Sequence, residues 1–95
     1  MIMRVSLMNY KIKIHTQVRK YLDAQDSKTQ QRLIKGLRQL ESNPLTRDVK
    51  KLKGTKGRRD LYRLRIGDYR AIFSIEGDLI EVTEVIIRGK GYKWL

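Results

Sequence analysis

The sequence contains no cysteine and a single histidine, His15. The absence of cysteine excludes disulfide bonds and thiolate zinc sites, and one imidazole cannot supply a cluster of metal ligands. We therefore expect no bound metal and no small-molecule cofactor.

Acidic residues are also scarce. The 95 residues include 10 Asp and Glu against 22 Lys and Arg, which gives a formal net charge of +12 at pH 7. Such a charge favours a polyanionic partner, because Lys and Arg bind nucleic-acid phosphates in a salt-sensitive manner that does not depend on sequence. The charge does not distinguish a nuclease from a non-catalytic RNA-binding module.

Long apolar runs are missing as well. The first eight residues, MIMRVSLM, are too short for a signal peptide or a membrane span and are interrupted by Arg4. We expect a cytoplasmic protein without a membrane partner. Residues 1–8 are predicted to be a poorly ordered N-terminal extension and residues 9–95 a single domain, since a chain of this length has little room for a second core.

The pattern of apolar residues predicts a strand from Tyr10 to His15 and then two helices. The first helix covers about residues 17–25, with Thr16 as its cap. The second is expected to begin at a capping box of Ser27 and Gln30 and to end before Pro44. Its predicted buried face consists of Leu33, Ile34, Leu37 and Leu40.

Residues 45–59 are interpreted as a basic loop that Val49 and Leu52 attach to the domain. Strands are predicted over residues 60–66, 69–75 and 79–87. The order β-α-α-β-β-β indicates an α+β fold, with a helical hairpin packed on one face of a largely antiparallel four-stranded sheet. The opposite face is expected to stay open to a ligand.

The two-residue turn Gly67-Asp68 fixes the pairing of the first two strands of this group. It sets Arg65 opposite Arg70, and it brings Arg63 to the same face of the sheet. Like charges directly opposite destabilise a sheet by up to about 1 kcal/mol, so a bound anion would account for them. Two alternatives stay open: the arginines form a solvated face, or they pair with Glu84, whose register the turn at residues 76–78 leaves undetermined.

The run DLYRLRIGDYRAIFSI over residues 60–75, followed by a strand that ends in RGKGYK over residues 88–93, resembles the RelE family of toxins. The resemblance extends over about residues 9–93. It implies the toxin of a toxin–antitoxin system, a ribosome-dependent endoribonuclease that cuts mRNA in the ribosomal A site. The partners it implies are a cognate antitoxin and the ribosome with its mRNA and rRNA.

Matched position by position, the resemblance implies a phosphate-binding role for Arg70 and basic positions at Arg63 and Arg65. Tyr92 corresponds to a tyrosine near the family's C-terminus, and Lys90 or Arg88 to its last-strand cation. The predicted catalytic residues are Arg63, Arg65, Arg70, Lys90 and Tyr92. The predicted RNA- or ribosome-binding residues are Lys50, Lys51, Lys53, Lys56, Arg58, Arg59 and Arg88.

Cleavage of RNA by its own 2′-hydroxyl requires a base, stabilisation of the phosphorane charge and protonation of the leaving 5′-oxygen, and needs no metal. Arginine is a poor base, because its pKa exceeds about 12. Tyr92, Lys90 or Lys53 must then act as the base, or the enzyme works through positioning and electrostatics. An alternative function with the same fold and no RNA cleavage is inhibition of DNA gyrase, as in ParE-like relatives.

Overall fold

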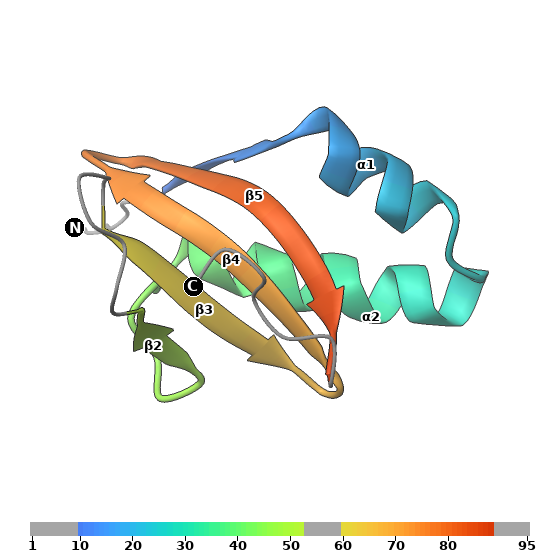
Figure 1. Cartoon of the computed structure of the whole chain (residues 1–95). Coiled ribbons are helices and arrows are strands. Elements are labelled where there is room, and N and C mark those ends of the chain that lie inside the picture. Colours follow the sequence, from blue (N-terminus) through green and yellow to red (C-terminus); the bar gives the residue numbers. More distant parts are fainter. Residues whose placement is uncertain (1–9, 53–59, 89–95) are drawn as a thin grey trace, which may run out of the picture.

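The computed structural model describes residues 10–52 and 60–88, and these form two helices and a five-stranded sheet (Figure 1). The α+β class predicted from the sequence is confirmed. The elements in chain order are β1 (Lys11–Ile14), α1 (Thr16–Asp23), α2 (Ser27–Arg38), the 3₁₀ turn η1 (Gln39–Glu41), β2 (Val49–Lys51), β3 (Leu61–Ile66), β4 (Tyr69–Glu76) and β5 (Leu79–Ile87).

The strands are arranged in the order β1-β5-β4-β3-β2, and only β1 with β5 is a parallel pair. The two helices follow β1 and cover one face of the sheet, as Figure 1 shows. The two helices carry the chain from β1 to β2 at the opposite edge of the sheet, and the antiparallel strands that follow bring β5 back beside β1. Neither α1 nor α2, the two helices of the described part, has the length and apolar character needed to cross a bilayer.

The prediction of four strands and a basic loop over residues 45–59 is wrong by one strand. Residues Val49–Lys51 form β2, which pairs antiparallel with β3 and sets Val49 opposite Leu64. Val49 packs against the core, as the sequence analysis expected. The strand escaped prediction because three residues with two lysines carry no detectable alternation.

The starts of both helices differ from the prediction by one residue. Helix α2 is capped by Asp26, whose Oδ1 accepts a hydrogen bond of 2.9 Å from the backbone nitrogen of Thr29, and Ser27 is its first residue. Helix α1 begins at Thr16 itself, and its N-cap, His15, makes no capping bond through its side chain. An aspartate caps a helix as well as a serine does, so either position of the start fits the sequence.

The core lies between the helices and the sheet. Leu33, Leu37 and Leu40 are buried as predicted and face strand residues such as Phe73. Ile34, predicted to be buried with them, is 40% exposed. The reason is that α2 meets the sheet through the neighbouring face of the helix, which contains a glycine.

That glycine, Gly36, allows α2 to approach β3 closely. A Cβ atom built on it would lie 2.8 Å from two side-chain carbons of Ile66, less than the separation of atoms in van der Waals contact. Glycine is therefore required here for packing, since a larger residue would push the helix away from the end of the hairpin. The hairpin end is also where the predicted site residues Arg65 and Arg70 lie.

Candidate functional site

The pairing of β3 with β4 is the one predicted from the two-residue turn. Arg65 lies opposite Arg70, and Arg63 lies opposite Ile72. Since opposite residues of a sheet share a face, all three arginines leave the backbone on the side away from the helices. Lys50 of β2 lies opposite Arg63 and adds a fourth cation to this face.

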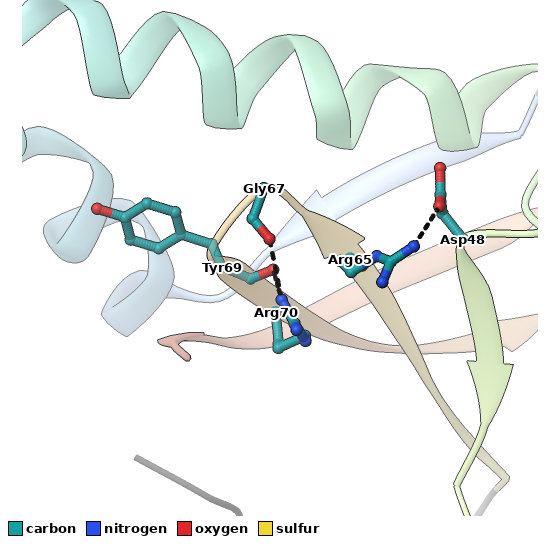
Figure 2. Close-up of polar contacts among 5 residues, drawn as sticks. All are labelled: Asp48, Arg65, Gly67, Tyr69 and Arg70. Atoms are coloured by element: carbon teal, nitrogen blue, oxygen red, sulfur yellow. Dashed lines mark hydrogen bonds and ion pairs between the residues drawn. The ribbon is translucent and has the colours of Figure 1, made fainter. Parts of the chain in front are cut away.

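Arg70 is folded back onto the hairpin turn. Its Nη1 donates hydrogen bonds of 3.1 Å to the carbonyl of Gly67 and 3.0 Å to the carbonyl of Tyr69 (Figure 2). Only Nη1 takes part in these two bonds, so they leave Nε and Nη2 of the guanidinium available as donors. The turn thus holds a half-buried arginine in one orientation, as binding of a phosphate in a fixed position requires.

The predicted pairing of Arg65 with Arg70 is present, but contrary to expectation the two side chains do not converge. Its Nη2 lies 3.5 Å from Oδ1 of Asp48, and Figure 2 shows the two guanidinium groups pointing apart. The backbone nitrogen of Arg65 donates a 3.0 Å hydrogen bond to the carbonyl of Asp48, the residue just before β2, so the two residues lie side by side across the strands. The guanidinium of Arg65 therefore has a carboxylate beside it on the neighbouring segment.

Arg63 is half-buried, and its buried Nε has no hydrogen-bond partner among the described residues. Its neighbour across the strands, Ile72, is fully buried, and Ser74 on the same face is only 3% exposed. The sheet face opposite the helices was predicted to be open to a ligand, and around Ile72 and Ser74 it is not. Arg65, toward the hairpin turn, and Lys50 of β2 are exposed.

The structure settles the position of Glu84. A bulge at Thr83 shifts the pairing of β5, so that Phe73 lies opposite Val82 while Ile72 lies opposite Glu84. Glu84 therefore shares the face of Arg63, and Val85 is buried in the core. Sequence reasoning could not place this carboxylate, because a bulge adds one residue without a signature that the alternation reveals.

The other predicted RNA- or ribosome-binding residues of the described part are Lys51 and Arg88. Lys51 pairs with Asp60 at 3.1 Å, and this hydrogen bond raises the pKa of Lys51. Arg88 is exposed, and its backbone nitrogen donates to the carbonyl of Asp68 at 2.6 Å, beside the hairpin turn. Lys53, Lys56, Arg58, Arg59, Lys90 and Tyr92, and the predicted extension over residues 1–8, lie outside the described residues.

The aromatic residues of the hairpin belong to the core side. Tyr62 stacks on Phe73, with ring centroids 5.6 Å apart, and Tyr69 meets Tyr21 of α1 edge to face at 6.4 Å. Burial, and then the neighbouring Tyr69, raise the pKa of the Tyr21 hydroxyl. These rings hold the helices on the sheet and leave the opposite face to the cations.

Comparisons with known proteins agree with this arrangement. Residues 12–92 match the family described as ParE toxin of type II toxin-antitoxin system, parDE. The archaeal RelE of the RelE–RelB complex from Pyrococcus horikoshii is 39% identical over 88% of this chain and all of its own, with a TM-score of 0.74. No curated protein sequence matched the chain.

Two further solved structures share the fold at lower identity. The toxin–antitoxin complex RelBE2 from Mycobacterium tuberculosis contains a chain that is 21% identical, with coverage of 85% of this chain and 100% of that chain and a TM-score of 0.71. A mutant of E. coli RelE in the free state is 20% identical, covers 90% of both chains and gives a TM-score of 0.66.

Proposed function

The chain belongs to the RelE/ParE superfamily of toxins of type II toxin–antitoxin systems, and from that premise we propose that it is an endoribonuclease that cuts mRNA in the ribosomal A site. The nearly full-length similarity to an archaeal RelE supports this choice within the superfamily. Its partners would be a cognate antitoxin, as in the RelE–RelB complexes, and the ribosome carrying mRNA.

The observation that carries the proposal is the direct pairing of Arg65 with Arg70, with Arg63 one row further along the same face. Cations placed opposite each other repel, and among the described residues Asp48 compensates Arg65 while the hairpin turn holds Arg70 through two carbonyls. The bonds from Arg70 to the turn use Nη1 alone, so they do not occupy Nε and Nη2. A phosphodiester group at this point would accept a bidentate pair of hydrogen bonds.

The reaction needs only the RNA and the protein. The 2′-oxygen attacks the adjacent phosphorus after losing its proton to a base, and the phosphorus–5′-oxygen bond breaks as that oxygen takes up a proton. The products are a 2′,3′-cyclic phosphate and a 5′-hydroxyl. Arg70 stabilises the extra negative charge on the phosphorane, a contribution that is often the largest in such reactions.

The base is proposed among Tyr92, Lys90 and Lys53, which lie outside the described residues. Arg63 and Arg65 remain charged and serve as electrostatic stabilisers. In this scheme no step uses a metal ion or a cofactor.

Toeprinting of translating ribosomes tests the proposal. Wild type is compared with Arg70→Ala and Tyr92→Phe, with no divalent ions beyond those the ribosome needs. We expect A-site cuts with wild type and a loss of about 10²- to 10³-fold with Arg70→Ala. If wild type arrests growth and yields no cuts, the ribonuclease proposal is wrong.

A second function deserves a test because the matching family is that of ParE toxins. ParE-like relatives act by binding DNA gyrase, without cleavage of RNA. Inhibition of gyrase supercoiling by wild type, unchanged in Arg70→Ala, would support this second function. Binding of RNA with neither cutting nor gyrase inhibition would instead indicate a non-catalytic RNA-binding module.

A further inference from the structure

Helix α2, the C-terminal end of β3 and Asp48 line a pocket of about 250 Å³ on the other side of the hairpin from Arg70. It has a cationic wall and an apolar floor. The residues that line it include Arg32, Lys35, Gly36, Asp48, Arg65 and Ile66.

The charges in this pocket are unbalanced. Arg32 and Lys35 come from α2 and Arg65 from β3, whereas Asp48 is the only carboxylate among the described residues that line it. The contact of Asp48 with Arg65 is long, at 3.5 Å, and both side chains are about half exposed. One loosely held carboxylate thus faces three cations, which leaves room and charge for a second anion.

Packing against the sheet fixes the position of the cations. The close approach of Gly36 to Ile66 brings α2 down onto the hairpin. As a result Nη2 of Arg32 lies against the turn, 2.5 Å from the point that a Cβ on Gly67 would occupy. An arginine and a lysine three residues apart on a helix repel each other, so helix stability does not account for this pair.

The pocket and Arg70 lie on the two sides of one turn. Nη2 of Arg32 occupies the space beside Gly67 where a Cβ would lie, while the carbonyl of Gly67 accepts the hydrogen bond of Arg70. Figure 2 shows the same division, with Arg65 and Asp48 on the side of α2 and Arg70 on the other side. A polyanion that crosses the turn can therefore contact both cationic groups at once.

We propose that this pocket binds a second backbone phosphate of the RNA, next to the phosphate held by Arg70. The identity of the anion as an RNA phosphate rests on the proposed function. Arg65 exchanges the carboxylate of Asp48 for the phosphate, and Arg32 with Lys35 completes the charge compensation. Arg32 and Lys35 of the pocket thus position the RNA and contact no reacting atom.

The other cations of α2 provide a matched control. Lys28 and Arg38 lie on the same helix and are exposed, but they do not line this pocket. Arg38 pairs instead with Glu41 at 3.6 Å. Replacing Arg32 and Lys35, or Lys28 and Arg38, by glutamine removes two positive charges in each case. A general attraction to RNA therefore predicts equal effects of the two double substitutions.

The test is fluorescence titration of full-length protein with a 2′-O-methyl RNA oligonucleotide, which binds but cannot be cut. We expect Arg32→Gln/Lys35→Gln to weaken binding about tenfold more than Lys28→Gln/Arg38→Gln. The salt dependence should also fall by about 0.7 in the log–log slope, the value for one lost phosphate contact on a single strand. The two sites are exposed, so thermal melts should show both variants folded.

Equal losses of RNA affinity in the two double variants, or no binding of RNA by wild type, would refute the proposal that the pocket binds a phosphate. The uncleavable RNA separates this outcome from the fate of the nuclease. A loss confined to the pocket variant supports the pocket even where ribosomes show no cuts. Conversely, A-site cutting together with equal losses of RNA affinity in the two double variants refutes the phosphate pocket and supports the ribonuclease.

Discussion

Arg65 and Arg70 lie directly opposite each other in the β3–β4 pairing, yet their guanidinium groups point apart. Asp48 holds the first at the sheet edge, and the carbonyl of Gly67 accepts a hydrogen bond from the second. The separation relieves the repulsion expected between opposite cations in a protein without a bound anion. Both contacts can be tested by substitution.

Replacement of Asp48 by asparagine should release Arg65. The pair is about half exposed, so unfolding free energy should change by less than about 1 kcal/mol. RNA affinity should rise about two- to fivefold, because no carboxylate then competes with phosphate. Asp68→Asn, which removes the same charge from the turn, is the control for titration of the uncleavable RNA. Equal gains in the two variants would refute a specific role for Asp48.

The two turn glycines form a second matched pair. Gly67 and Gly77 have φ of 57° and 61°, so alanine should cost about 1–2 kcal/mol of stability at either position. Only at Gly67 does the added Cβ meet a side chain, that of Arg32. Urea unfolding should therefore show similar losses, and only Gly67→Ala should weaken RNA binding. Unchanged RNA binding in Gly67→Ala would contradict the placement of Arg32.

Gly36→Ala tests the close approach of α2. Alanine gains up to about 1 kcal/mol in helix propensity, but its Cβ would overlap the side chain of Ile66, and overpacking costs about 1–3 kcal/mol. We expect net destabilisation of about 1–2 kcal/mol in urea unfolding. In an Ile66→Ala background the same substitution should become neutral or stabilising. A stabilising Gly36→Ala in wild type would show that the helix can shift without cost.

The cap of α2 should make stability depend on pH. The hydrogen bonds from Thr29 lower the pKa of Asp26 in the folded protein. The ionised cap therefore stabilises the fold above the unfolded pKa of about 3.9, and this contribution is lost as the pH falls through the folded value. Wild type should melt above Asp26→Asn at pH 7, and the gap should shrink below about pH 4. Asp23→Asn controls for the change of charge, and a gap independent of pH would argue against the ionised cap.

The sequence predicted what depends on local chemistry. The two-residue turn at Gly67 set the register of β3 with β4 correctly, and with it the row of Arg65 and Arg70. Helical spacing identified Leu33 and Leu37 as core residues. In each case the information lies within a few neighbouring residues, where turn geometry or helical periodicity decides the outcome.

What the sequence did not predict depends on contacts between distant segments. The orientation of Arg65 is set by Asp48, 17 residues earlier, which contacts its guanidinium and accepts a hydrogen bond from its backbone nitrogen. The place of Glu84 depends on the bulge at Thr83, which keeps Val85 in the core. Helical spacing grouped Ile34 with the core leucines, and it gives no indication that α2 packs on the sheet through Gly36.

The parallel pairing of β1 with β5 has a consequence for how the molecule folds. The first strand finds its only partner among the described residues at Leu79–Val82, and Gln17 donates a 2.6 Å hydrogen bond to the carbonyl of Thr83, 66 residues away. Contacts between such distant residues raise contact order and slow folding, because a long loop must close first. The sheet therefore cannot be completed during synthesis until β5 is available. A toxin with this topology gains its arginine face late, when almost all of the described chain has been made.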